Sequence, residues 1–361
     1  DGLRRFSLSY MAQLTARSVG VAVGVGAVSY AMYTYIVRTT DARWWWNQRK
    51  GPLEVSSKEN WEAELIHGAV TEGWESVREE FVQNFRARGE LGAAITVFHR
   101  GVKVVDLWGG YRDRGAQAPW EERTLAPVFS TTKGVTAFAL AIQKSRGAID
   151  YDGKVAQWWP EFAQNGKEDV TVRQLISHEC GLAGPAPPIA LATLRDKAAT
   201  RAFFAAAPMA WRTPGDYKGY MAVTLGNFES ALVQMSDGER RRSAGEFLRD
   251  ECFAPLGIED EIYVGTPASV PDARFAVIDG MSGLEPLFAD SFPPGFVRRL
   301  LLEPRSYTAR AFANPRLSAL PSVLDYNRRE VKEIELPAAN GNATARAVAT
   351  LYAAAERAIN D

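Results

Sequence analysis

The longest apolar stretch of the chain covers residues 18–37, which carry no charged side chain. Arg17 precedes this stretch and Arg38 follows it. Twenty helical residues span roughly 30 Å, the thickness of the hydrocarbon core of a bilayer. Three tryptophans at 44–46 fit the aromatic belt of a membrane surface. The pattern favours a single transmembrane helix in the lipid bilayer over a signal sequence or a buried core helix, and the basic residues on both sides leave its orientation open.

The segments beside this predicted helix are polar. Residues 1–17 contain three arginines and one acidic residue, and the chain begins with Asp, which fits the removal of a targeting peptide. By analogy with arginine-rich leaders, we expect a single-pass protein of the mitochondrial inner membrane. Gly20 and Gly24 give the helix a face of small residues, on which other transmembrane helices can pack. Residues 38–60 are interpreted as a juxtamembrane linker.

From there on, residues 61–361 have the pattern of one soluble domain. Residues 74–88 place apolar side chains at four-residue spacing, which predicts an amphipathic helix. Two short apolar runs at 94–98 and 102–107, separated by a turn, predict a β-hairpin. A further helix is expected to begin at Ser130. This order of elements indicates an α+β fold.

The composition narrows the possible functions. Hydrophobic residues make up 46% of the 361 positions and charged residues 24%, with a net charge of −1. Such a chain lacks the basic field that nucleic-acid binding requires, so no nucleic-acid partner is expected. The three histidines are not clustered, and the two cysteines form no metal-binding pair. We therefore expect no metal and no cofactor.

Ser130 and Lys133 form a candidate pair of nucleophile and base. Three residues are just under one helical turn, so both side chains lie on the same face of the helix predicted to begin there. A serine hydroxyl needs a base to take its proton, and a lysine shielded from water has its pKa lowered enough to do so. The alternative is a helix cap followed by a solvated lysine.

Several sequence blocks resemble, in order, those of the serine β-lactamase-related superfamily, most closely the class C β-lactamases and the carboxylesterases that share their fold. The resemblance runs from about residue 67 to residue 346. The blocks are FSTTKG at 129–134, RGAID at 146–150, VAQWWPEF at 155–162, GKEDVTVRQLISHECGL at 166–182 and WRTPG at 211–215. Linked blocks in this order are far more specific than any one of them.

This resemblance implies a β-lactamase/transpeptidase-like antiparallel sheet flanked by helices, and a reaction through an acyl-enzyme. Ser130 is then the nucleophile and Lys133 its base. The second motif of the family begins with a tyrosine that exchanges protons with the serine and the leaving group. Tyr220 matches it, and Tyr217 is the rival. Ala222 replaces an amide residue of true β-lactamases, which resembles the esterase branch.

Other chemically active side chains have simpler interpretations. In the family, the segment that contains His178 is structural, so we expect a satisfied histidine there and not a general base. Cys180 is expected to be a small packing residue. The three arginines at 240–242 are interpreted as a solvated turn.

The third motif of the family, Lys-Thr-Gly or His-x-Gly on a strand beside the nucleophile, has no match in this sequence. His99-Arg-Gly101 matches the His-x-Gly pattern, but it lies before Ser130 in the sequence and not after it. We therefore expect the family domain to be incomplete at its C-terminus and to expose a sheet edge beside Ser130, which a protein partner covers.

Two classes of function follow. The first is a membrane-anchored serine hydrolase that acts on an ester, amide or lactam, with its activity dependent on completion of the site. The second is a catalytically inactive accessory or scaffold subunit of a mitochondrial membrane complex. The presence of Ser130, Lys133 and Tyr220 favours the first class, and the missing third motif favours the second.

Overall fold

A long β-hairpin forms the centre of the larger sheet. Strands β2 (Gly92–His99) and β3 (Val102–Asp113) pair in antiparallel fashion and are joined at Arg100 and Gly101. These two residues have φ angles of 50° and 76°. A two-residue hairpin turn requires such positive values, which glycine adopts without strain. The hairpin predicted over 94–107 is confirmed, with longer strands.

The computed structural model describes residues 59–185, 187–211, 215, 217–279, 295–317 and 323–360. The predicted basic segment and transmembrane helix, with Gly20 and Gly24, and all but the last two residues of the predicted linker lie outside these ranges. Within them, no helix combines the length and apolarity needed to cross a bilayer. One compact unit extends over Asn60–Asp361.

The hairpin belongs to a four-stranded antiparallel sheet. Strand β1 (Ile66–Val70) pairs with β3, and the short β4 (Ala118–Pro119) pairs with the end of β3, so the order is β1-β3-β2. Helix α5 (Glu75–Ala87) packs against β1 and β3, which confirms the amphipathic helix predicted over 74–88. In the described ranges, no strand pairs with the second edge of β2.

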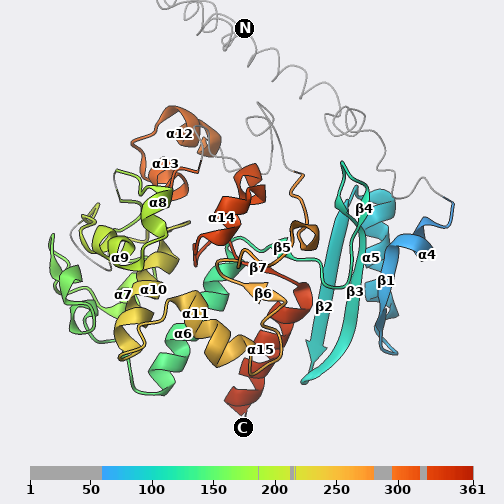
Figure 1. Cartoon of the computed structure of the whole chain (residues 1–361), viewed down its shortest axis with the longest axis horizontal. Helices are drawn as coiled ribbons and strands as arrows, with labels where there is room; N and C mark the ends of the chain where they lie inside the picture. Colours follow the sequence, from blue (N-terminus) through green and yellow to red (C-terminus); the bar gives the residue numbers. More distant parts are fainter. Residues whose placement is uncertain are drawn as a thin grey trace, which may run out of the picture. The chain divides into compact units, whose positions relative to one another are not determined.

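The helices that carry the candidate site lie on the other side of the molecule (Figure 1). Helix α6 (Thr131–Ser145) packs against α10 (Leu225–Ser236) and α11 (Ala244–Leu248). Helix α15 (Ala345–Asn360) packs against β2 and lies between the sheet and these helices (Figure 1). The domain is thus an α+β arrangement of antiparallel strands and helices, as the resemblance implies.

The remaining elements are short. A second antiparallel sheet has the order β5 (Ala126–Pro127), β7 (Asn342–Ala343) and β6 (Ile262–Tyr263). The other α-helices are α4 Trp61–Leu65, α7 Val172–Ile176, α8 Leu191–Leu194, α9 Lys197–Ala205, α12 Phe296–Leu302, α13 Tyr307–Phe312 and α14 Arg329–Glu333. Single turns are η2 Val155–Gln157, η3 Pro160–Ala163, η4 Arg249–Phe253, η5 Asp272–Arg274 and η7 Val323–Asn327.

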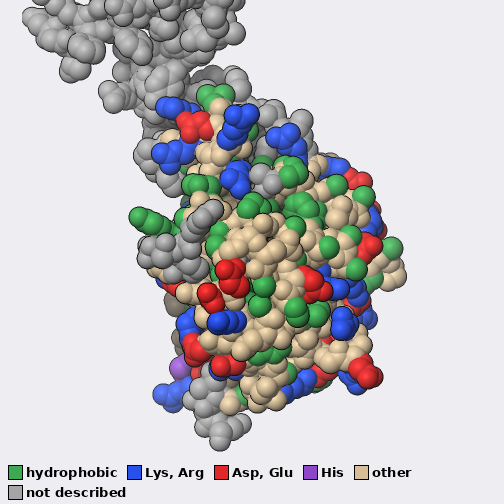
Figure 2. All heavy atoms as spheres, turned by 90° about the vertical axis from the view of Figure 1, so that its left-hand side faces the viewer, with side chains coloured by type: hydrophobic (Ala, Val, Ile, Leu, Met, Phe, Trp, Pro, Cys, Tyr) green, Lys and Arg blue, Asp and Glu red, His purple; other side chains and the backbone are tan. Residues whose placement is uncertain are grey.

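The main core surrounds α10, whose residues 225–234 are all buried. Four polar side chains are buried on this helix together with the apolar ones: Asn227, Glu229, Ser230 and Gln234. Phe228 of this helix packs with three further aromatic rings, at centroid distances of 4.9 to 6.5 Å: Trp159, Phe162 and Phe204. On the face of the molecule shown in Figure 2, acidic and basic side chains are interspersed and apolar ones gather mainly in the upper half.

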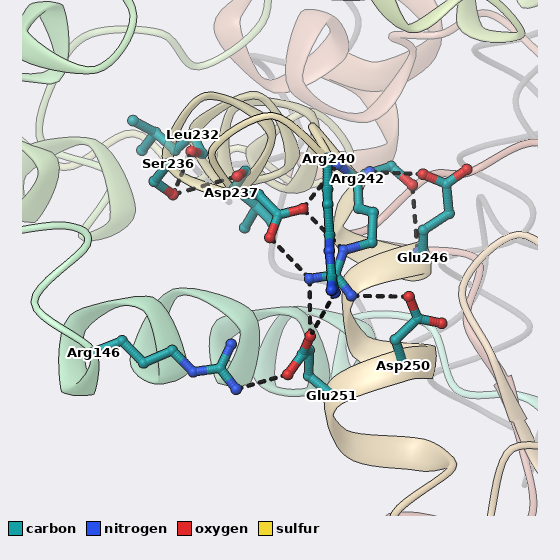
Figure 3. Close-up of polar contacts among 11 residues, drawn as sticks. Arg146, Leu232, Ser236, Asp237, Arg240, Arg242, Glu246, Asp250 and Glu251 are labelled. Atoms are coloured by element: carbon teal, nitrogen blue, oxygen red, sulfur yellow. Dashed lines mark hydrogen bonds and ion pairs between the residues drawn. The ribbon is translucent and has the colours of Figure 1, made fainter.

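A cluster of charges fixes the turn after α10 (Figure 3). Arg242 is at its centre, and its side chain is only 11% exposed. The carboxylates around it belong to Asp237, Asp250 and Glu251, at 2.8 to 2.9 Å. The same cluster reaches Arg146 at the end of α6. The prediction of a solvated turn is therefore wrong for Arg242, although Arg240 is 71% exposed.

Candidate active site

Ser130 stands at the N-terminal end of α6, in the N-cap position. The residue before it, Phe129, has a φ of 42°, which is unusual for a bulky side chain. Amides of the first helical turn donate to carbonyls three residues back, beginning with Thr131 to Val128. The strained residue and the tight turn place the Ser130 side chain at the surface, next to the positive end of the helix dipole.

The structure brings Ser130, Lys133 and Tyr220 together. The Ser130 Oγ lies 2.8 Å from the Tyr220 hydroxyl and 3.2 Å from the Lys133 Nζ. The Lys133 Nζ also donates to the carbonyl oxygens of Ala222, at 2.6 Å, and Ala338, at 2.9 Å. A lysine with these contacts is not a solvated side chain, so that alternative for Lys133 is wrong.

An ammonium can donate its three hydrogens to Ser130 Oγ and the two carbonyls, and a neutral amine can occupy the same position. Burial lowers the pKa of Lys133, while its hydrogen bond to Tyr220 and the charges of Tyr220 and Glu229 oppose that effect. A neutral amine has two hydrogens and one lone pair. If the hydrogens point to Ala222 and Ala338, the lone pair remains for the Ser130 hydroxyl hydrogen. The geometry can therefore hold the lysine as a proton acceptor.

Glu229 is a buried acid that sequence reasoning missed. It lies on α10, only 3% exposed, and its Oε2 has no hydrogen-bond partner among the described residues. Burial raises its pKa to about 8, and the charge of Lys133 opposes the rise. The signal in the sequence was a single acidic residue in a helix whose other side chains are apolar or uncharged. At neutral pH this carboxyl is mainly protonated, so it adds little negative charge beside Lys133.

His178 positions the segment that carries Tyr220. Its Nδ1 accepts a hydrogen bond from the Met221 amide at 3.1 Å, and its carbonyl accepts one from the Gly219 amide at 2.9 Å. The His178 and Tyr220 rings lie 5.0 Å apart. Burial, with the charges of Lys133 and Lys218, lowers the pKa of His178 to about 4. A neutral imidazole held by the backbone fits the structural role expected for it.

Two other expectations concern neighbouring side chains. Tyr217, the rival of Tyr220, is 68% exposed and packs against Trp211. Cys180 is buried, as a packing residue should be, and burial raises the pKa of its thiol to about 12. In the parts of the chain that the structure describes, no group of three or more His, Cys, Asp or Glu side chains is arranged to hold a metal ion.

The segment 337–341 reaches the site from late in the chain, where the Ala338 carbonyl accepts a hydrogen bond from Lys133. Thr136 donates to the Pro337 carbonyl at 2.6 Å, and the Gly341 amide donates to Thr132 at 2.9 Å. Gly226 allows the close approach of α10, since a Cβ there would lie 2.2 Å from the Pro337 carbonyl carbon. Sequence reasoning missed these residues because nothing local marks a contact across 200 positions.

Fold and site together define a β-lactamase-fold protein with a serine at the start of a helix. The chain belongs to the Beta-lactamase family, whose model matches residues 78–361. It is 33% identical to the esterase/beta-lactamase LipL of Mycobacterium tuberculosis over 80% of this chain and 64% of LipL. The chain thus spans 64% of the length of that curated relative.

Two solved structures are similar over most of the chain. A family VIII carboxylesterase has a TM-score of 0.68 and 33% identity, and the match covers 80% of this chain and 70% of that one. A penicillin-binding protein homologue from Caulobacter crescentus has a TM-score of 0.63 and 35% identity, over 79% and 70%. The resemblance to the serine β-lactamase-related superfamily is confirmed, with esterases among the relatives.

Proposed function

We propose that this protein is a serine hydrolase of the esterase type, with Ser130 as nucleophile, Lys133 as general base and Tyr220 as proton shuttle. One observation carries the proposal: the Ser130 hydroxyl lies within hydrogen-bond distance of both an amine and a phenol. Names of similar proteins, esterase/beta-lactamase and carboxylesterase, support the choice of an ester. Ala222 in place of an amide residue supports it too.

The reaction has two halves. Ser130 Oγ attacks the ester carbonyl carbon while its proton passes to the Lys133 Nζ. The carbon–oxygen bond to the alcohol then breaks, and Tyr220 gives a proton to the departing oxygen and regains one from Lys133. Water later attacks the acyl-enzyme with the same groups in reverse roles. The Ser130 amide, at the N-terminal end of α6, is the donor we assign to the developing oxyanion.

The simplest test is hydrolysis of a neutral aryl acetate by the full chain. We expect turnover that Ser130→Ala abolishes and that Lys133→Met reduces by about 100-fold or more. Lys144→Met, at the exposed end of the same helix, is the matched control and retains the wild-type rate. Turnover that survives Ser130→Ala would contradict the proposal. A chromogenic β-lactam in the same assay should react more slowly than the ester.

The scaffold alternative predicts a different pattern. A domain kept only as a structural subunit gains nothing from a half-buried lysine held by two carbonyls at the nucleophile. The contacts of Lys133 therefore favour the hydrolase. Equal turnover, at background level, for the wild type and Ser130→Ala would favour the scaffold.

We also propose that residues 18–37 anchor the protein in a membrane, in the mitochondrial inner membrane by the leader analogy, and that Gly20 and Gly24 contact other helices there. This proposal rests on the sequence alone. Carbonate extraction of membranes checks the anchor: the protein should stay in the pellet. Release into the supernatant would contradict it, and cell fractionation checks the compartment.

A further proposal concerns the unpaired edge of β2. A strand edge with free amides and carbonyls readily takes another strand. We propose that a strand of another polypeptide pairs with β2 in the native setting. Cross-linking within isolated membranes should then join Gly92–His99 to a second chain. Cross-links from β2 to residues of its own domain alone would contradict this assignment.

A further inference from the structure

Aromatic side chains flank Ser130 on two sides. Phe129, next to it in the chain, is 37% exposed and packs edge-on against Tyr326 at a centroid distance of 5.2 Å. Tyr220 is 45% exposed, and its ring lies 6.4 Å from that of Phe312, which is 39% exposed. Apolar surface therefore continues from the nucleophile across Tyr220 to α13.

The Phe312 ring is held in place by contacts within the domain. Phe296 of α12 packs edge-on against it at 5.1 Å. Helix α13, which carries Phe312 at its end, begins at Tyr307, and the Tyr307 hydroxyl donates to the Ala210 carbonyl at 3.3 Å. The support matters because a fixed ring costs less conformational entropy when a ligand binds than a freely rotating one.

The position of Tyr220 indicates which part of an ester reaches Phe312. In the proposed reaction Tyr220 protonates the departing alcohol oxygen, so that oxygen must come within hydrogen-bond distance of its hydroxyl. The alcohol part of the ester then extends over the Tyr220 side of Ser130. Among the described residues, Phe312 is an exposed apolar side chain whose ring lies next to that of Tyr220.

We infer that Phe312 is a specificity-determining residue that contacts the alcohol part of the substrate, and that the site prefers neutral esters of aromatic or other bulky apolar alcohols. This inference rests on the proposed function. An aromatic ring packed against Phe312 gains favourable edge or offset contacts beyond the burial of its area.

Because the reaction has two steps, the loss of a contact with the alcohol can be distinguished from a general loss of activity. During acylation the bond from Ser130 Oγ to the carbonyl carbon forms, the ester bond breaks, and the alcohol leaves with a proton supplied through Tyr220. Every acetate ester then yields the same acetyl-enzyme. A contact with the alcohol therefore changes kcat/KM among acetates and has no effect on the hydrolysis of the shared intermediate.

The test compares two ester series on the full chain. The alcohol series is ethyl acetate against benzyl acetate, and the acyl series is ethyl acetate against ethyl hexanoate. Phe312→Ala should lower the benzyl-to-ethyl ratio of kcat/KM by about five- to tenfold and leave the acyl ratio unchanged. Phe312→Leu should recover part of the loss. Leu302→Ala, which removes a 75% exposed apolar side chain of α12, is the control and should change neither ratio.

Two results would overturn the inference. An unchanged benzyl-to-ethyl ratio in Phe312→Ala, with hydrolysis still dependent on Ser130, would remove Phe312 from the alcohol site. A change confined to the acyl series would place the acyl chain there instead. Hydrolysis that survives Ser130→Ala would contradict the proposed function itself, and that outcome is distinguishable because it does not involve Phe312.

Discussion

At the scale of single residues, the chemistry of the site depends on the proton of Lys133. Two carbonyls accept hydrogen bonds from its Nζ, and the Ser130 hydroxyl takes the third position. Burial favours the neutral amine, while any negative charge nearby favours the ammonium. Glu229 is the acid whose charge acts on Lys133. Its own pKa of about 8 means that this charge appears only in alkaline solution.

Glu229→Gln should shift the pH dependence of Ser130 labelling toward lower pH. Above about pH 8 the wild-type carboxyl ionises and holds the proton on Lys133, whereas glutamine stays neutral. The variant should therefore reach its maximal rate at a lower pH than the wild type. At pH 9 its Ser130 should be phosphonylated roughly two- to tenfold faster. The measurement is the rate of Ser130 labelling by a fluorophosphonate from pH 6 to pH 10.

The control for this experiment is Glu239→Gln, which removes an exposed acid from the turn after α10. Its pH profile should coincide with that of the wild type. If Glu229→Gln and Glu239→Gln both leave the profile unchanged, Glu229 does not influence Lys133.

At the scale of elements, the site depends on how α6 and α10 hold the segment 337–341. Thr132 and Thr136 bind this segment from α6, and Gly226 admits it against α10. The Ala338 carbonyl thereby reaches Lys133. Thr132, Thr136 and Gly226 thus fix the position of the Ala338 carbonyl. This carbonyl accepts a hydrogen bond from Lys133, to which the three residues are not themselves hydrogen-bonded.

Gly226→Ala should damage both stability and the site. The added Cβ would lie 2.5 Å from the Ala338 nitrogen, so the segment must move. We expect a loss of about 1–3 kcal/mol in the free energy of unfolding, and slower labelling of Ser130 because Lys133 loses an acceptor. Urea unfolding and labelling kinetics measure the two effects.

Gly115→Ala is the matched control, because its Cβ would meet only the Asp113 carboxylate at 3.4 Å. This variant should stay within about 0.5 kcal/mol of the wild type. Equal stability of the two glycine variants would show that the approach of segment 337–341 to α10 is not close enough to matter.

The charge cluster at the end of α10 makes a separate prediction. Arg242→Ala leaves Asp237, whose side chain is 7% exposed, without its main partner. Removing one partner of such a buried pair typically costs about 3 kcal/mol. Arg240→Ala removes a 71% exposed side chain and should cost less than about 1 kcal/mol. Thermal unfolding compares them, and a similar loss in both variants would mean that burial of Arg242 is energetically unimportant.

At the scale of the whole molecule, the sequence predicted two kinds of feature. These are elements with a local pattern of residues, and residues within sequence blocks that follow one another in the order of the family. The hairpin and the amphipathic α5 follow from periodicity, and Ser130 and Lys133 share one helical turn. Tyr220 is 90 positions from Ser130, so only the family blocks indicated it. Ala338 is 205 positions from Lys133 and contributes a backbone oxygen, which no residue type specifies.

The same reasoning explains the error at Arg242. Three consecutive arginines look like a solvated turn because sequence alone does not reveal which carboxylates surround them. The acids that bury Arg242 come from the end of α10 and from η4. Their arrangement is a property of the packed domain, and only the fold brings them to one side chain.

The most direct test of the account is to label the nucleophile covalently and locate the adduct. After reaction of the full chain with a fluorophosphonate, mass spectrometry of intact protein and peptides should show one adduct, on Ser130. Lys133→Met should slow its formation by about 100-fold or more in a protein that still unfolds in one cooperative thermal transition, because the variant lacks the base. An adduct on a different serine, or an unchanged rate of labelling in Lys133→Met, would contradict the assignment of Ser130 and Lys133 as nucleophile and base.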